Sequence, residues 1–156
     1  MQGDAQVIEL LNECLTAELT AVNQYFVHAK MQENWGYERL AQRGRDESIE
    51  EMKHAEQLIY RILIIEGVPN MQRLFPVRVG ETVKEQIEAE LETEVDAITR
   101  YNDGVKLCHE KGDAVSRELL ERLVADETEH ADWLEAQLVL IDQVGIENYL
   151  AQQIRG

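Results

Sequence analysis

Two short segments of this chain place a glutamate three residues before a histidine. They are Glu51–His54 and Glu127–His130. On an α-helix, residues i and i+3 lie on the same face, so the carboxylate and the imidazole of each pair can reach a common point. Carboxylate oxygen and imidazole nitrogen are ligands for divalent transition metals. Each segment could therefore supply half of a metal site.

The spacing of the two pairs indicates an internal repeat. Acidic residues are common enough here, 31 of 156, for a single Glu-x-x-His pair to arise by chance. The two pairs, however, lie 76 residues apart, and the same offset relates other identical residues. These matches include Glu18 with Glu94, Tyr25 with Tyr101, Val7 with Val83, Leu15 with Leu91, Ala55 with Ala131, and Leu58 with Leu134. We expect a repeated helix pair whose two copies are related by a pseudo-twofold axis.

The elements that position these residues are four long predicted helices. Apolar residues recur with the helical period over 5–34, 37–66, 82–111 and 114–144. Each helix carries one glutamate near the middle of its apolar stripe: Glu18, Glu51, Glu94 and Glu127. The segment 67–80 holds both prolines and has no clear period, so it is predicted to be a long ordered connection. Thr82, three residues before Glu85, indicates a capping box, and the amphipathic tail 146–154 is compatible with a short fifth helix.

Composition and charge limit the classes of function. The chain is 44% hydrophobic with only two prolines, which favours one helical domain over 1–156. A formal charge of −16 disfavours binding to nucleic acid and favours the accumulation of cations. Cys14 and Cys108 lack a paired spacing and fit a reducing compartment. No signal peptide or membrane-spanning run is recognisable, so a soluble, cytoplasmic protein is expected.

The four glutamates and two histidines predict one site in the centre of the bundle. A single glutamate in an apolar stripe usually keeps its carboxylate in water at the edge of the core, but this interpretation does not account for four such glutamates with symmetric histidines. Burial of four carboxylates without compensation would cost several kcal/mol each, whereas two divalent cations would balance them. The donors suit iron or manganese and also admit zinc. Sequence alone leaves open which glutamate pair bridges the metals.

Three further residues carry alternatives. Tyr25 and Tyr101 lie two turns beyond Glu18 and Glu94, and each could either hydrogen-bond a ligand carboxylate or be an ordinary core aromatic. Met52 points about 100° away from Glu51, so it cannot share the internal site. Ile59 and Leu63 fall near the direction of Met52, which predicts an outward apolar stripe of the kind found at a subunit interface.

The chain resembles the bacterioferritins, the haem-containing branch of the ferritins, over essentially its whole length. The segments that carry the resemblance are Met1–Asp4, Asn23–Phe26, Glu51–Ala55, Ser116–Leu120 and Ile146–Leu150. The resemblance implies an all-α, ferritin-like four-helix bundle with a long crossover between helices 2 and 3 and a short C-terminal fifth helix. It also implies iron storage in a hollow shell of 24 copies, with a ferroxidase centre in each subunit. The implied di-iron ligands are Glu18, Glu51, His54, Glu94, Glu127 and His130, with the glutamates of the two Glu-x-x-His pairs as bridges.

The same resemblance assigns roles outside the metal ligands. Met52 and its counterpart in a neighbouring subunit would bind a shared haem b, which passes electrons inward to release stored iron. A bacterioferritin-associated ferredoxin would be the electron donor, and co-assembly with a second ferritin subunit is left open. Tyr25, as a catalytic residue, and Trp133 are candidate electron or radical sources. His130 is mobile in some relatives and gates iron between the centre and the cavity.

Two departures from the family pattern are visible. Some relatives carry a histidine at an inner-surface iron site, whereas the nearest candidates here are Asp46 and Glu50. In addition, Leu58 stands where one relative has an aromatic residue.

Three alternative functions remain. The first is a haem-free ferritin or another di-iron oxidase, for which replacement of Met52 by Leu should leave the absorption spectrum unaltered. The second is a helical interaction protein whose acidic pairs are structural or bind zinc passively. A DNA-protecting miniature ferritin is disfavoured, because its ligands come from two subunits and this chain carries all six.

Overall fold

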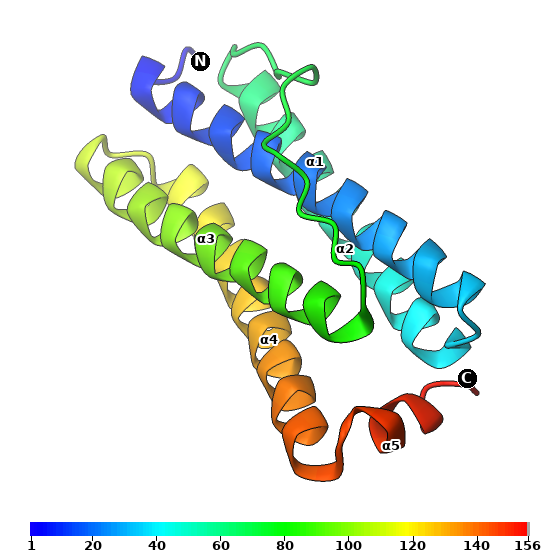
Figure 1. The fold of residues 1–156 in the computed structure, drawn as a ribbon. Coiled ribbons are helices and arrows are strands. Elements are labelled where there is room, and N and C mark those ends of the chain that lie inside the picture. The colour runs from blue at the N-terminus through cyan, green and yellow to red at the C-terminus, as the bar shows by residue number, and fades with distance from the viewer. Residues whose placement is uncertain (156) are drawn as a thin grey trace.

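The structure, a computed structural model, describes residues 1–155 and is built from helices (Figure 1). Within these residues the elements are α1 (Ala5–Asn34), α2 (Glu38–Ile64), α3 (Val83–Glu110), α4 (Ala114–Val144) and α5 (Ile146–Ala151), and no strand occurs. The predicted all-α bundle, with four long helices, a crossover and a short fifth helix, is confirmed. The predicted second helix, 37–66, is slightly shorter, and the tail forms a helix over six residues.

The four long helices form two antiparallel hairpins. α1 packs along α2 and α3 packs along α4, and the two hairpins meet mainly through α1 and α3. The turns of the hairpins contain Gly36 and Gly112, whose φ angles are +91° and +71°. Because such values favour glycine, these two residues allow each chain reversal within a few residues.

Side-chain caps explain where α1, α3 and α4 begin. Asp4 accepts hydrogen bonds from two backbone amides at the start of α1, and Asp113 does the same for the Ser116 amide of α4. Thr82 caps α3 by accepting from the Glu85 amide, as predicted. The Glu85 carboxylate, however, accepts from the Glu81 amide, one residue before Thr82. In the usual capping box the glutamate accepts from the amide of the N-cap residue, whereas here it accepts from the amide of the residue before the N-cap.

The crossover between α2 and α3 lies along α1, where polar side chains hold it (Figure 1). Asn12 bonds to both Val68 and Asn70, and Thr20 Oγ1 accepts from the Phe75 amide at 2.9 Å. Further along, Gln24 donates to the Arg78 carbonyl and His28 accepts from the Gly80 amide. These four α1 residues lie at four- and eight-residue intervals, so they form one polar stripe that fixes the path of the crossover.

Two apolar clusters fill the bundle, one towards each end. The first contains Leu11, Leu58 and Leu120, and the second contains Ile87, Leu134 and Tyr149. α5 belongs to the second cluster, and the Tyr149 hydroxyl donates to Gln137 of α4 at 2.7 Å. Between the clusters lies a band of buried polar side chains that includes the predicted metal ligands. The helices thus enclose a polar centre between two apolar ends.

Candidate metal centre

The six predicted ligands converge in the middle of the bundle, and none of their residues is more than 5% exposed. Two groups of donor atoms occur, each with all atoms within 4.8 Å of one another. The groups are Glu18, Glu51, His54 and Glu127, and Glu51, Glu94, Glu127 and His130. Glu51 and Glu127 belong to both groups. The arrangement therefore suits two adjacent cations with these two carboxylates between them.

Two tyrosines connect the hairpins at this centre. The Tyr25 hydroxyl of α1 donates to Glu94 Oε1 of α3 at 2.5 Å, and the Tyr101 hydroxyl of α3 donates to Glu18 Oε1 of α1. Burial and the charge of the adjacent glutamate raise the pKa of each tyrosine well above its usual value, so both hydroxyls keep their protons. The two bonds are equivalent under the 76-residue repeat, as a pseudo-twofold axis requires.

The histidines contact acids from both hairpins. His54 Nδ1 lies 2.9 Å from Glu127 Oε1, and its Nε2 lies 3.1 Å from Asp126 Oδ2. Burial acts to lower the pKa of His54, but the bonds to Glu18 and Asp126 and their charges raise it to about 9. The pKa of His130 is also raised, because Glu94 and Glu47 outweigh its burial. Without metal, protonated imidazoles compensate part of the acidic charge.

Some carboxylate oxygens at the centre have no protein partner within residues 1–155, and one of the glutamates there tends to hold a proton. Burial, together with the charges of Glu18 and Glu94, raises the pKa of Glu51 well above its usual value. Three buried carboxylate oxygens, Oε2 of Glu18, Glu94 and Glu127, have no hydrogen-bond partner within residues 1–155. Unpaired buried oxygens are costly, so oxygens left free at one point mark a place that fits cations.

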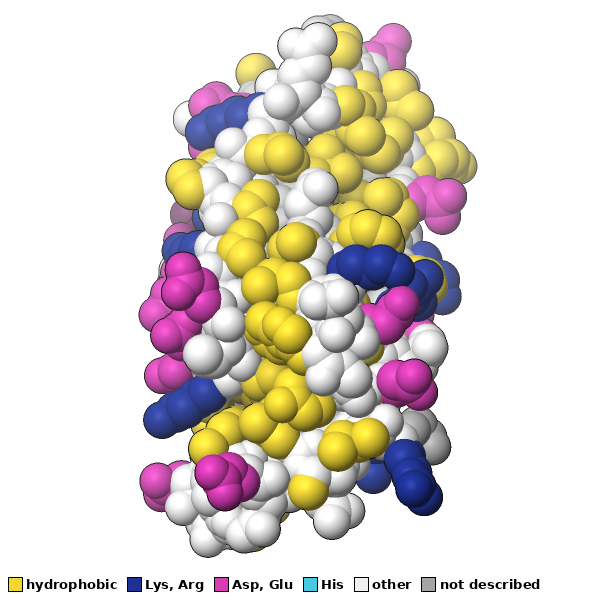
Figure 2. All heavy atoms as spheres, turned by 45° about the vertical axis from the view of Figure 1, so that its right-hand side comes forward, with side chains coloured by type: hydrophobic (Ala, Val, Ile, Leu, Met, Phe, Trp, Pro, Cys, Tyr) yellow, Lys and Arg dark blue, Asp and Glu magenta, His cyan; other side chains and the backbone are white. Residues whose placement is uncertain are grey.

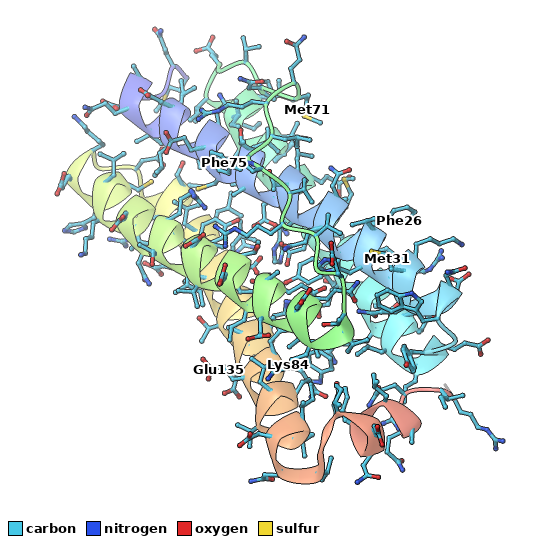
Figure 3. The ribbon with its side chains drawn as sticks, viewed as in Figure 1. Phe26, Met31, Met71, Phe75, Lys84 and Glu135 are labelled. Atoms are coloured by element: carbon cyan, nitrogen blue, oxygen red, sulfur yellow. The ribbon has the colours of Figure 1, made fainter. Side chains whose placement is uncertain are left out.

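Openings reach the centre from two sides, and both are lined by more acidic than basic residues. A cavity of about 290 Å³ lies under the crossover, where Phe75 (labelled in Figure 3), Arg78 and Arg100 accompany the four ligand carboxylates. A second cavity, of about 430 Å³, lies between α2 and α4 and is lined by Glu47, Glu50, Asp126 and Glu129 beside the histidines. Apart from the ligands, the second opening is lined by four acids and Arg43, whereas the first is lined by Asp96 and two arginines, so the second offers more carboxylates to a passing cation.

Comparison with known proteins identifies the family. Residues 8–144 match the family model of the ferritin-like domain. The chain is 55% identical to a bacterioferritin of Mycobacterium leprae and 54% identical to one of Mycobacterium tuberculosis, over 97% of this chain and 96% of each relative. It is 51% identical to a bacterioferritin of Streptomyces coelicolor, over 99% of this chain and 92% of that protein.

The chain belongs to the bacterioferritin family. Membership of this family supports iron storage within an oligomeric shell, and the carboxylate and histidine groups described above are consistent with a di-iron site. Among residues 1–155, no helix combines the length and apolar character needed to cross a membrane.

Other residues that the resemblance to bacterioferritins singles out lie in differing environments. Met52 is 48% exposed on α2, beside Ile49 at 50%. Leu63 is exposed as expected, whereas Ile59 packs against the first apolar cluster, so the outward stripe is narrower than predicted. Leu58 is fully buried. Asp46 and Glu50 lie on the surface of α2, and Glu50 lines the acidic cavity.

Sequence reasoning missed several acids around the bacterioferritin-like centre. Glu47 Oε2 lies 3.5 Å from His130 Nδ1, and Asp126 touches His54 from the outside. Glu47 is one turn before Glu51, a signal that could have placed it near the site. His28 and Glu90 form a buried pair, with His28 Nδ1 2.6 Å from Glu90 Oε2. Because His28 Nε2 accepts from the Gly80 amide, its Nδ1 must be the donor to Glu90.

Proposed function

We propose that this chain is a single-domain ferroxidase subunit, spanning 1–156, that oxidises Fe²⁺ and stores the ferric product. The substrate is Fe²⁺, and dioxygen or peroxide is the oxidant. The proposed ligands are Glu18, Glu51, His54, Glu94, Glu127 and His130, with Glu51 and Glu127 between the two ions. The observation that carries this proposal is that these two glutamates belong to both donor groups, while three neighbouring carboxylate oxygens have no hydrogen-bond partner among the described residues, 1–155.

The protein's own part in the reaction is to hold two ions close together and to balance charge. Four carboxylates offset the four charges of two Fe²⁺ ions, and they stabilise the higher charge of the ferric product further. Tyr25 lies 2.5 Å from Glu94 and 3.1 Å from His130 Nδ1, so it is in position to supply an electron and a proton near the site. His130 stacks on Trp133 at 6.2 Å between ring centroids, which extends this aromatic contact towards the surface. We assign Tyr25 the catalytic role on this basis.

The acidic cavity between α2 and α4 supports passage of iron between the centre and the store. Its rim carries four acids in addition to the ligands and one arginine, Arg43, whose guanidinium lies over the Trp133 ring. An iron ion that leaves the centre through this cavity would stay close to carboxylates along its path. We propose that this cavity faces the interior of the shell.

A haem b between two subunits is the second part of the proposal. The Met52 thioether is exposed, soft and flanked by the exposed Ile49 on the same helix face, which fits a haem iron and an apolar macrocycle. Such a haem would supply one-electron transfer for reductive release of iron. The proposed assembly is a 24-subunit shell built from dimers in the cytoplasm, with a bacterioferritin-associated ferredoxin as electron donor. A second ferritin subunit in the shell remains compatible with these features.

A Glu94→Ala variant tests the ferroxidase proposal. Aerobic addition of Fe²⁺ to metal-free wild-type protein should give a fast rise in ferric absorbance that saturates at about two Fe²⁺ ions per chain. The variant should slow this phase about 100-fold or more, because loss even of groups behind a metal ligand costs about 10- to 100-fold.

Glu88→Ala is the matched control, since Glu88 lies exposed on the same helix. It should leave the fast phase unchanged. A wild-type protein without any fast phase would remove the enzymatic function and leave a passive metal-binding or structural bundle. An unchanged rate in Glu94→Ala would contradict the assigned ligands.

A further inference from the structure

The repeat gives the metal centre a second tyrosine, and its environment differs from that of the first. Tyr101 is 1% exposed and belongs to the first apolar cluster, together with Cys14. Its hydroxyl bonds to Glu18 Oε1. Tyr25, in contrast, bonds to Glu94 and also approaches His130 Nδ1. The hydroxyl of Tyr101 therefore acts on one carboxylate, while that of Tyr25 contacts two prospective ligands.

The bond from Tyr101 determines which oxygen of Glu18 is free. Oε1 is occupied by the tyrosine hydroxyl, whereas Oε2 has no hydrogen-bond partner within residues 1–155. Oε2 faces the first donor group, where it lies 3.6 Å from His54 Nδ1. Glu94 repeats this pattern, with Oε1 bonded to Tyr25 and Oε2 without a hydrogen-bond partner in the described part of the chain. In both halves a tyrosine holds one oxygen and leaves the other for a cation.

We propose that Tyr101 is a positioning residue that fixes Glu18 with Oε2 towards the metal of the Glu18–His54 half. This role rests on the proposed di-iron function. With Tyr25 acting on Glu94, the two tyrosines give the two metal positions matched outer carboxylates. Loss of the Tyr101 hydroxyl would free Glu18 to rotate and would weaken one position selectively. The pair of positions would then become unequal.

Titration of metal-free, assembled protein with Co²⁺ measures this difference directly, without turnover. Wild-type protein should bind about two Co²⁺ per chain, with visible spectra characteristic of the bound ion. Tyr101→Phe keeps the buried ring and removes only the hydroxyl. It should weaken one of the two positions by about 10- to 100-fold, the scale of a hydrogen bond to a charged group, and should leave the other position within about twofold. The spectrum of the weakened position should change.

Matched tyrosine variants separate positioning from a general loss of structure. Tyr149→Phe removes the hydroxyl of another buried tyrosine, one that donates to Gln137 instead of to a proposed ligand, and it should bind Co²⁺ as wild type does. Tyr25→Phe should weaken the other metal position, that of Glu94 and His130. In the double variant, with both tyrosines replaced by phenylalanine, the two losses of Co²⁺ affinity should add.

The possible outcomes distinguish this inference from the function on which it rests. Wild-type binding well below two ions would overturn the proposed di-iron function itself. Two normal positions in Tyr101→Phe would overturn the role of Tyr101 alone. Equal weakening of both positions, or a lower melting temperature with no selective change, would also overturn it. Failure of Tyr101→Phe to assemble would overturn the role as well, because a hydroxyl that only positions Glu18 is not required for the fold.

Discussion

At the scale of residues, the metal-free centre holds protons in the places where cations are proposed to bind. His54, with a pKa of about 9, carries a proton at neutral pH. The pKa of His130 is raised as well, and that of Glu51 is raised well above its usual value by burial and by neighbouring carboxylates. A cation that uses these groups as ligands must displace the protons.

Binding of Zn²⁺ to the metal-free protein should therefore release protons and become tighter as pH rises from about 6 to 9. The sign follows from the raised pKa values: below them the proton competes with the metal, and above them the ligand is free. Calorimetric titration in buffers of different ionisation enthalpy counts the protons released. Affinity that is independent of pH would mean that His54 and Glu51 are not ligands.

Spacing on a helix could predict the ligands but not their hydrogen-bond partners. Glu51 and His54 belong to one helical face by their spacing, and the repeat supplies the other half. The alternatives for Tyr25 and Tyr101 could not be decided from the sequence, because each bond crosses from one hairpin to the other. Asp126 was missed for the same reason: it lies one turn before His130 on its own helix, but its contact is with a histidine of α2.

At the scale of elements, the crossover depends on polar side chains of α1. The Phe75 amide has Thr20 Oγ1 as its acceptor, and Thr20 also donates to the carbonyl of Thr16 within the helix. Phe75 lines the cavity above the metal centre. The stability of this contact therefore affects how closely the crossover covers that opening.

Thr20→Val should destabilise the protein by about 1–3 kcal/mol, because it leaves the amide of Phe75 without its acceptor at unchanged side-chain size. Hydrogen exchange at the Phe75 amide should become faster, while exchange in the centre of α1 should stay slow. Thr128→Val is the control, since the Thr128 hydroxyl also bonds back to its own helix but is exposed and does not contact the crossover. Equal exchange rates at Phe75 in both variants would show that Thr20 does not hold this segment.

The four long helices were predictable to within two residues and the short fifth helix to within three, but the contacts between elements were not predictable. The apolar period placed α1 and α4 at their observed bounds, and its loss over 67–80, with both prolines, indicated the end of α2. The path of the crossover was not predictable. It depends on the polar side chains of Asn12, Thr20, Gln24 and His28. The periodicity of the sequence does not indicate which residues, more than 50 positions away, these side chains contact.

At the scale of the whole molecule, the surface carries a long apolar band. Figure 2 shows hydrophobic side chains running continuously down one face, with charged side chains mainly along its margins. Exposed large apolar residues on α1 and α2 include Phe26, Ile49, Met52, Tyr60 and Leu63, and Phe26 projects outward from α1 (Figure 3). Apolar exposure on this scale is typical of a surface that another protein chain covers.

Met52→Leu should abolish the visible absorption of bound haem while leaving the oligomeric mass and the rate of Fe²⁺ oxidation unchanged. Leucine keeps the apolar volume of the interface but has no thioether for the haem iron. Absorption spectra of protein purified with added haem, together with light scattering, test this expectation. An unaltered spectrum would favour a haem-free ferritin, and loss of assembly would assign Met52 to subunit contacts alone.

The 76-residue repeat has a consequence for how little chain is needed to build the centre. Each hairpin carries one outer glutamate, one shared glutamate, one histidine and one tyrosine whose bond reaches the other hairpin. A single hairpin of this kind, paired with a copy of itself, would present the same six donors and the same two crossed bonds. A half-length chain that self-associates would thus suffice to build this centre. Among residues 1–155 the crossover is the one long connection, and it joins the two equivalent halves into a single chain.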